Sequence, residues 1–322
     1  MDELYPLRFA PIFKNYLWGG RRLAEWFPTV PATGPVAEAW LVSDEAVNPS
    51  VVANGLLKGA TLRTLMEQFG ERLLGRPANG RFPLLLKFLD AKAALSVQVH
   101  PTDEQAAATV ADGRGKTEAW VVLHAEPGSR IYAGLKPGVN PAGMRRAIAE
   151  NGFSQVLHDF EPRPSDCVFL PAGTVHAIGA GLMIFEVQQT SDITYRLYDW
   201  DRVDPKTGLG RPLHVEESLA CTNWEFGPCD PVRPVAESAT RQRLVDCGHF
   251  RLWRHHADVP FTVGAKGECR IAVGVSGTGV LDWSGKEYRL ATGDVLLLPA
   301  AVGACRVVPD GAATVLECGL PF

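Results

Sequence analysis

The sequence of 322 residues predicts a mainly β protein of sandwich or barrel type, made of two units with a few short helices. The 32 glycines and 24 prolines are spread along the chain and separate many short apolar runs, a spacing typical of strands joined by turns. Helical periodicity is confined to a few segments. In addition, one segment from the middle of the chain recurs near its end, which indicates two related units.

Four segments carry helix signals. Thr61 caps a run to Leu74 whose apolar residues fall on one helical face. A second helix opens with the capping-box pattern of residues 102–105, directly after a predicted strand. A third begins at 140–141, a cap followed by a first-turn proline, and runs to about Glu150. A fourth covers residues 214–221.

A proline-rich stretch separates the two predicted units. Residues 225–237, EFGPCDPVRPVAE, contain three prolines and no hydrophobic period, so we interpret them as a linker. Residues 241–322 alternate short strands with glycine-rich turns. We therefore expect a first domain at 1–230, which includes the N-terminal segment and the short helices, and an all-β second domain at 231–322.

The internal repeat links the two units. Residues 166–176, DCVFLPAGTVH, align without gaps on residues 294–304, DVLLLPAAVGA. Both predict a turn, a buried strand and a proline that ends the strand. The second copy has Ala304 where the first has His176, so any chemistry of His176 is lost from the second unit.

The composition excludes several classes of partner. Charged residues make up 21% and the net charge is −4, which gives no global footprint for nucleic acid or an anionic membrane. The N-terminus lacks a signal-peptide pattern, and no apolar run is long enough to cross a bilayer. We therefore expect a soluble cytoplasmic protein. Its seven scattered cysteines predict reduced thiols rather than disulfides.

One predicted strand places unusual polar groups on a single face. In LSVQVHP, residues 95–101, every second side chain points the same way, which groups Ser96, Gln98 and His100. A sheet with one solvated face explains such alternation equally well. Two other segments also set polar residues against apolar runs, namely Lys116 and Glu118 in 115–123 and His176 in 171–178.

Four of these residues would make a divalent-metal site: Gln98, His100, Glu118 and His176. Imidazole and carboxylate ligands suit Zn²⁺, Fe²⁺, Co²⁺ or Mn²⁺, and an open coordination position would make the site catalytic. The simpler alternatives are hydrogen-bonded core histidines, an ion pair between Glu118 and Lys116, and a glutamine that satisfies a backbone group.

The turn before His176 favours the metal site. Its pattern P-x-G-x-x-H, from Pro171 to His176, resembles the second motif of cupins, small antiparallel barrels that hold a metal inside. The remaining histidines are isolated or lie beyond the linker, and we assign none of them to the metal: His124, His158, His214, His249, His255 and His256.

Several longer runs together resemble type I phosphomannose isomerases in their shorter bacterial form. These are FPLLLKFLDAKAALSVQVHP, GKTEAWVVL and VFLPAGTVHAIGAGLMIFEVQQTSDITYRLYDWDR, with FAPIFKNYLWGGRRL, EAWLVSD and RPLHVEESL in support. The resemblance runs from about Phe9 to Leu219 and continues more weakly beyond. It implies two cupin-type jelly-roll units, the second without metal ligands, and one divalent metal, usually zinc.

The resemblance also implies an activity, the interconversion of mannose 6-phosphate and fructose 6-phosphate. The family's metal ligands fall on Gln98, His100, Glu118 and His176, its active-site arginine on Arg196 and a carboxylate on Glu186. Its phosphate-side residues correspond to Ser96 and Lys87. The chain has no room for the large helical insertion of longer members. Trp18 and Tyr198 are left out of the catalytic set.

An isomerase of this kind must stabilise an enediolate and move a proton between C1 and C2. Arg196 would supply a fixed positive charge. Glu186 is our first choice as base, with a pKa tuned toward neutrality, and Lys116 or a metal-adjacent water are the rivals. Lys87, Lys116, Ser96 and Arg196 are the candidate donors to the phosphate.

Other functions remain open on the sequence alone. The chain could be a non-catalytic sugar-phosphate-binding cupin, or a metal-dependent cupin, such as an Fe²⁺ dioxygenase, that acts on another substrate. The expected partner is a small hexose 6-phosphate, with no nucleic acid and no membrane, and the expected state is a monomer or homodimer.

Overall fold

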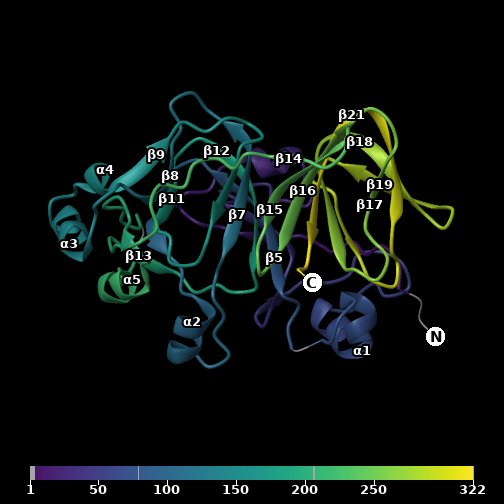
Figure 1. The fold of residues 1–322 in the computed structure, drawn as a ribbon, viewed down its shortest axis with the longest axis horizontal. Helices are drawn as coiled ribbons and strands as arrows, with labels where there is room; N and C mark the ends of the chain where they lie inside the picture. Colours follow the sequence, from purple (N-terminus) through teal and green to yellow (C-terminus); the bar gives the residue numbers. More distant parts are fainter. Residues whose placement is uncertain (1–3, 79, 206, 322) are drawn as a thin grey trace.

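The computed structural model describes residues 4–78, 80–205 and 207–321, which form a mainly β protein with few helices. This part of the prediction is confirmed. Two groups of strands lie side by side along the longest axis of the molecule (Figure 1). Strands between residues 12 and 198 form the first group, and strands between 235 and 319 form the second.

The first group consists of a six-stranded and a five-stranded antiparallel sheet. The six-stranded sheet has the order β1 (Ile12–Lys14), β2 (Glu38–Val42), β5 (Leu84–Ala91), β12 (Leu182–Gln189), β7 (Glu118–Ala125) and β10 (Cys167–Leu170). The five-stranded sheet has the order β13 (Tyr195–Tyr198), β6 (Val97–Val99), β11 (His176–Ile178), β8 (Ile131–Leu135) and β9 (Leu157–Phe160). A small ribbon pairs β3 (Asp44–Glu45) with β4 (Asn48–Pro49).

These two sheets pack face to face. One buried cluster joins Leu89, Trp120 and Ile184 of the six-stranded sheet to Ile131 and Ile178 of the five-stranded sheet. Alternating side chains on facing sheets produce such a core. Among the described strands, the hydrogen bonds do not close into a barrel, so this half consists of two packed sheets.

The second group is one eight-stranded sheet. Its path is β14 (Val235–Ala236), β15 (Arg241–Asp246), β16 (Arg251–Ala257), β21 (Cys305–Gly319), β18 (Arg270–Trp283) and β19 (Lys286–Ala291), with β17 (Phe261–Val263) on β21 and β20 (Val295–Leu298) on β18. The internal repeat behaves as predicted. Asp166 leads into buried β10 and Asp294 into buried β20, and a proline follows each strand.

The two groups share a hydrophobic core. Phe88 and Phe185 of the six-stranded sheet belong to the same buried cluster as Phe250, directly before β16, and Leu316 on β21. The N-terminal segment also crosses to the second group, because Leu7 exchanges backbone hydrogen bonds of 2.8 and 2.9 Å with Leu297. The second group is thus bound to the first by a continuous apolar contact.

All four predicted helices are present. They are α1 (Leu62–Leu74), α2 (Asp103–Thr109), α3 (Pro141–Ala149) and α5 (Val215–Cys221). Thr61 caps α1, Thr102 and Gln105 form the predicted capping box of α2, and Asn140 caps α3. Two single turns, η1 (Arg22–Glu25) and α4 (Phe153–Val156), were missed because four residues are too few to show a period. Residues 222–234, which cover most of the predicted linker, contain no helix or strand.

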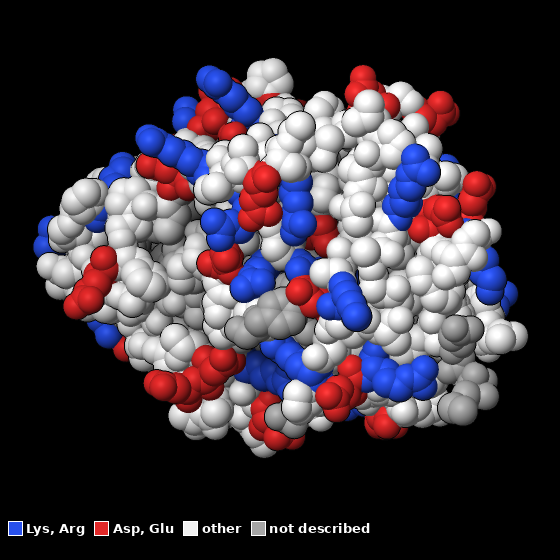
Figure 2. Space-filling model, turned by 45° about the vertical axis from the view of Figure 1, so that its right-hand side comes forward, with Lys and Arg blue, Asp and Glu red and all other residues white. Residues whose placement is uncertain are grey.

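Charge and cysteine chemistry agree with the composition. Lys and Arg side chains alternate with Asp and Glu over the face in Figure 2, so no patch of one sign dominates it. All seven cysteines are free, as predicted. Within the described ranges, no helix is long and apolar enough to cross a membrane.

Candidate metal centre

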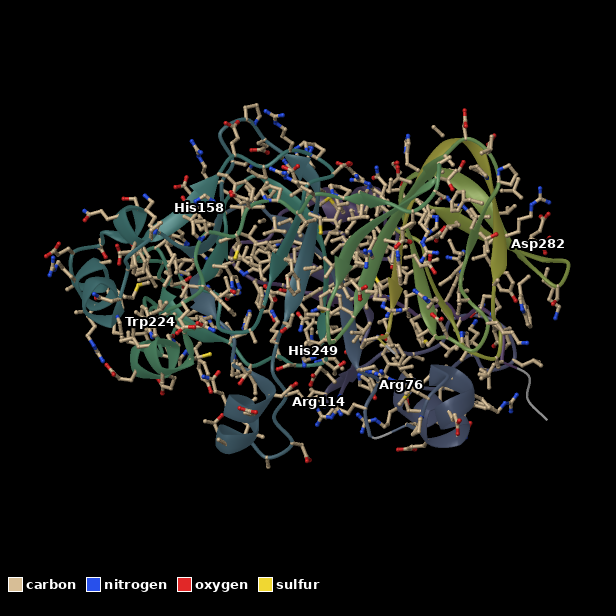
Figure 3. All side chains as sticks on the ribbon, in the orientation of Figure 1. Arg76, Arg114, His158, Trp224, His249 and Asp282 are labelled. Carbon is tan, nitrogen blue, oxygen red and sulfur yellow. The ribbon has the colours of Figure 1, made fainter. Side chains whose placement is uncertain are left out.

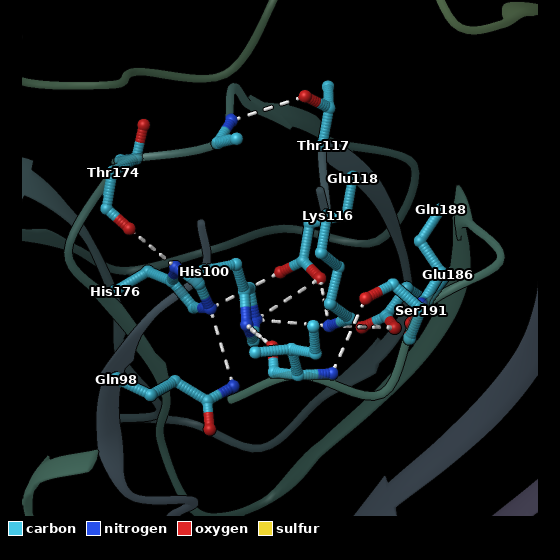
Figure 4. Close-up of polar contacts among 12 residues, drawn as sticks. Gln98, His100, Lys116, Thr117, Glu118, Thr174, His176, Glu186, Gln188 and Ser191 are labelled. Carbon is cyan, nitrogen blue, oxygen red and sulfur yellow. Dashed lines mark hydrogen bonds and ion pairs between the residues drawn. The ribbon is translucent and has the colours of Figure 1, made fainter. Parts of the chain in front are cut away.

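Three side chains predicted as metal ligands meet inside the first group of strands. His100 follows β6, Glu118 begins β7 and His176 begins β11. All three are buried, and their potential ligand atoms lie within 4.8 Å of one another. Figure 4 shows them converging, with 3.2 Å between His176 Nε2 and Glu118 Oε1 and 3.6 Å between His100 Nε2 and Glu118 Oε2.

The turn that delivers His176 explains its sequence motif. Leu170 at the end of β10 pairs with Glu118, and His176 pairs with Gln98 on the other sheet, so residues 171–175 carry the chain between the sheets. Gly173 has φ of +89°, a conformation that favours glycine. Its N–H donates to the carbonyl of His100 over 2.8 Å. The turn therefore positions both histidines at once.

Both imidazoles present Nε2 to the centre. His100 Nδ1 donates to the carbonyl of Ile193, and His176 Nδ1 donates to the carbonyl of Thr174, each over 2.9 Å. Such bonds fix the tautomer that leaves Nε2 unprotonated. Burial, reinforced by the charge of Lys116, lowers the pKa of His176 to about 4 and that of His100 well below its usual value.

This donor set fits a divalent metal ion. The imidazoles are held neutral, which is the form that binds metal. Glu118 Oε1 is buried and receives no hydrogen bond, so a positive partner is missing at that oxygen. Two imidazole nitrogens and a carboxylate oxygen are the ligands that Zn²⁺ and related ions take in catalytic sites.

Gln98 lies beside this group with its amide nitrogen inward. Its Nε2 is 3.3 Å from His176 Nε2, and its Oε1 accepts from the Ser96 hydroxyl over 3.2 Å. Rotation of the amide by 180° exchanges the two atoms and turns the oxygen toward the histidines, and the choice between them depends on the surrounding hydrogen bonds. A metal ion at Nε2 of His176 would favour the rotated amide.

Lys116 contacts the same ligand atoms. Its ammonium group donates to Glu118 Oε2 and lies 3.0 Å from His100 Nε2. The ion pair considered as an alternative from the sequence is therefore present. It does not displace the metal interpretation, because it leaves His176 and Glu118 Oε1 facing each other. Lys116 and a metal ion would compete for the lone pair of His100.

A buried row of alternating charges extends from this group. Lys87 Nζ lies 3.0 Å from Glu186 Oε1 and 3.8 Å from Glu38 Oε2, and Lys116 Nζ lies 3.7 Å from Glu186 Oε1. Trp120 donates to Glu186 and Trp40 donates to Glu38. Each buried charge thus has an opposite neighbour, as low-dielectric surroundings require.

The expectation that the pKa of Glu186 is tuned toward neutrality is wrong, because of its position in this row of charges. Burial alone raises the pKa of its carboxyl, but the charges of Lys87 and Lys116 outweigh burial and lower the pKa to about 2. The pKa therefore moves away from neutrality. Glu186 therefore remains ionised and is a weaker proton acceptor than an ordinary carboxylate.

A cavity of about 140 Å³ opens beside the three ligands. The remaining predicted site residues, with Gln98, all line it: Lys87, Ser96, Lys116, Glu186 and Arg196. Arg196 on β13 pairs with Gln98 on β6, which explains its position near the ligands. Trp18 also lines the cavity, whereas Tyr198 stacks on Phe153 with centroids 4.7 Å apart.

Sequence reasoning missed other residues of this cavity, including Glu38, Asp192, Tyr16 and Arg211. A signal for Glu38 existed, since it is the one charged residue in the otherwise apolar strand EAWLV. Asp192, Tyr16 and Arg211 lie in runs that carry the family resemblance, but no residue pattern around them marked these three as site residues.

The other histidines lie elsewhere. Figure 3 labels His158 and His249, which lie far apart in the view, and neither belongs to the metal-type group found among the described residues. His158 pairs with Asp230 over 2.9 Å. His255, in the second group of strands, forms a fully buried pair with Glu317 at 2.8 Å.

Fold and site together define a mainly β protein with a buried two-histidine, one-carboxylate centre beside a polar cavity. The model of the phosphomannose isomerase type I catalytic domain matches residues 7–118. The chain is 34% identical over 307 residues to mannose-6-phosphate isomerase ManA of Bacillus subtilis, covering 94% of this chain and 95% of that protein. It is also 34% identical over 299 residues to mannose-6-phosphate isomerase of Streptococcus mutans, covering 92% and 93%.

A solved structure agrees. The mannose 6-phosphate isomerase of Bacillus subtilis superposes with a TM-score of 0.89 at 30% identity, covering 97% of this chain and 99% of that one. The chain belongs to the type I phosphomannose isomerase family.

Proposed function

We propose that this chain is a metal-dependent aldose–ketose isomerase that interconverts mannose 6-phosphate and fructose 6-phosphate through an enediolate. The observation that carries the proposal is the buried group of His100, Glu118 and His176 beside a cavity lined by charged residues of both signs. The chain belongs to this family and has both the potential metal ligands and the charged cavity residues that the isomerisation requires. The substrate itself is the one named for the relatives.

The metal would be held by His100, Glu118 and His176, with Gln98 as the fourth ligand. We assign Zn²⁺ to the site, because two imidazoles and a carboxylate are typical of catalytic zinc. When bound, such an ion polarises a carbonyl and stabilises negative charge on the adjacent oxygens. His100 and His176 serve as neutral ligands, and their bonds to backbone carbonyls keep Nε2 directed at the ion.

The remaining cavity residues would act on the substrate directly. Arg196 stays protonated and stabilises the enediolate with a fixed charge. One base would take the proton from C1 or C2 and return it to the other carbon; the candidates are Lys116 in its neutral amine form, Glu186 and a water molecule. Glu186 would keep Lys116 in place, while Ser96 and Lys87 would bind substrate hydroxyl or phosphate oxygens.

The finer description of the fold belongs to the same proposal. We infer two cupin-type jelly-roll units, a catalytic one at 1–230 and one at 231–322 without metal ligands. The supporting observation is the repeated turn, strand and proline at β10 and β20. We propose a cytoplasmic protein that is a monomer or homodimer, with seven free thiols in support of a reducing compartment.

The test is a coupled isomerase assay combined with elemental analysis. We expect the purified protein to contain about one metal ion, to lose turnover of mannose 6-phosphate on chelation, and to regain it with Zn²⁺ or Co²⁺. No turnover after metal reconstitution would refute the enzyme. If the metal-loaded protein then bound mannose 6-phosphate without converting it, the result would indicate the sugar-phosphate-binding alternative.

A further inference from the structure

The cavity beside the metal ligands is too small for the whole substrate. Its volume of about 140 Å³ is below the roughly 300–1,000 Å³ of ordinary small-molecule sites. A second cavity of about 450 Å³ adjoins it, and Tyr16, Trp18 and Arg211 line both. A hexose 6-phosphate with its C1–C2 end at the metal ligands would extend past these shared residues into the outer cavity.

Arg211 is held firmly at this junction. Its Nε and Nη2 donate to the two carboxylate oxygens of Asp199 over 2.8 and 2.5 Å, and Asp199 is buried. The backbone N–H of His214 donates to the carbonyl of Arg196 over 2.8 Å. The segment that carries Arg211 is therefore attached alongside β13, which carries Arg196.

The other edge of the Arg211 guanidinium is available to a ligand. Asp199 takes the Nε and Nη2 side, and among the described residues no hydrogen bond to Nη1 is found. Arg202 shares the same carboxylate, with its Nη1 3.8 Å from Asp199 Oδ1, and lines the outer cavity. Two guanidinium groups around one carboxylate make a favourable place for a phosphate.

The inner cavity, which is the one of about 140 Å³ beside the metal ligands, is a less favourable place for the phosphate. Lys87 has two carboxylate neighbours, Glu186 and Glu38, whereas the single carboxylate of Asp199 is shared by two guanidinium groups. Burial, and then repulsion by Arg211, lower the pKa of Arg196, so these two cations lie close enough to repel each other. An anion near Arg211 would relieve that repulsion. Asp204 also lines the outer cavity, so recognition there would depend on directed N–H donors more than on net charge.

We propose that the substrate phosphate lies at the junction of the two cavities on the Nη1 side of Arg211, and that Arg211, oriented by Asp199, determines specificity for phosphorylated sugars. This inference rests on the proposed isomerase function and deepens it. Arg196 is then left for the reacting end of the sugar, where a fixed charge is needed.

The decisive variant is Arg211→Gln. A hydrogen bond to a charged group contributes enough that we expect KM for mannose 6-phosphate and the inhibition constant of inorganic phosphate each to rise about 10- to 100-fold, with kcat changed less than about threefold. Arg211→Lys keeps the charge beside Asp199 without the guanidinium fork, so it should recover part of the lost affinity.

Arg145→Gln is the matched control. Arg145 forms a similar two-bond pair with Glu216, at 2.6 and 2.7 Å, but on an exposed surface away from both cavities. This variant should leave KM and phosphate inhibition unchanged. An Arg211→Gln enzyme with unchanged KM, or with a lower kcat and unchanged phosphate inhibition, would overturn the proposal.

The inference can be separated from the proposed function by calorimetry. Titration of the metal-loaded protein with inorganic phosphate measures the anion site whether or not turnover occurs. Phosphate binding that weakens in Arg211→Gln supports the site even if the wild type proves inactive on mannose 6-phosphate. Equal phosphate affinity in the wild type and Arg211→Gln refutes it even if the isomerase activity is present.

Discussion

At the scale of the residue, segment 95–101 shows how alternating apolar and polar side chains place potential metal ligands on one face of a strand. Leu95, Val97 and Val99 are buried in hydrophobic clusters, while Gln98 lines the inner cavity and His100 faces Glu118. Solvent does not explain the polar face, since His100 is 1% exposed. Its neighbours across the sheets, Glu118 and His176, supply the other ligand atoms.

The roles of His100 and Arg196 can be separated by measurement. His100→Ala removes a proposed ligand, so we expect metal content to fall to background and metal affinity to drop more than about 100-fold, beyond the effect of a supporting residue. Arg196→Ala removes no ligand and should keep metal while lowering kcat.

Elemental analysis and zinc titration of both variants check this prediction. His158→Ala is the matched control, because His158 pairs with the exposed Asp230 and lies outside the group of potential metal ligands. Equal metal loss in His100→Ala and Arg196→Ala would contradict the division into ligand and charge-stabilising residue.

At the scale of the element, helix α1 shows how the second group of strands completes the first. The last carbonyls of a helix have no partner within it. In α1 the carbonyls of Arg72, Leu73 and Leu74 accept from the N–H groups of 301, 300 and 269, which belong to the second group. Helix signals in 61–74 therefore predicted the helix, while the donors to its last carbonyls lie 195 to 229 residues further along the chain.

Gly75, which directly follows α1, has no room for a side chain. Its φ is +80°, and an added Cβ would collide with the backbone oxygen of Gly267. We expect Gly75→Ala to reduce the free energy of unfolding by about 2 kcal/mol or more, from backbone strain and the collision together.

Urea denaturation of the metal-free protein measures this effect. Gly59→Ala is the control, since Gly59 has φ of +93° and nothing within 4 Å of an added Cβ, so it reports strain alone at about 1 kcal/mol. Equal losses in the two variants would show that contact with Gly267 contributes nothing.

At the scale of the whole molecule, the second group of strands has a buried polar core of its own. Glu317 pairs with His255 and lies 3.9 Å from both Arg241 and Arg270, and the two arginines lie over the ring of Trp253 at 4.4 and 4.2 Å. No substrate role is needed to explain this cluster. Its charges make the stability of the whole protein depend on pH.

The sign of that dependence follows from Glu317. Burial alone raises the pKa of its carboxyl, but the hydrogen bond to His255 and the charges of Arg241 and Arg270 outweigh it, and the folded pKa is lowered. Its contribution is present above the unfolded pKa of about 4.3 and is lost as pH falls through the folded pKa.

We therefore expect the difference in melting temperature between wild type and Glu317→Gln to shrink as pH falls from about 5 to 3. Scans of the metal-free proteins exclude metal loss as a cause. A difference that stays constant over this range would show that the charge of Glu317 does not stabilise the fold.

The sequence by itself determined the local features of this protein. Thr61, Thr102 and Asn140 predicted helix starts because capping is a contact between near neighbours. The alternation in 95–101 and the turn from Pro171 to His176 predicted ligand positions, because strand periodicity and glycine turns are also local. The mainly β class followed from the same short-range signals.

Tertiary structure alone decided what surrounds those positions. Lys116 at the ligand atoms, Lys87 between two carboxylates, and Arg211 at the junction of the cavities join residues from separate strands and loops. The lowered pKa of Glu186 depends on these neighbours. Distances and burial across packed sheets set such interactions, and a linear pattern contains neither, so they become visible only when the sheets are packed together.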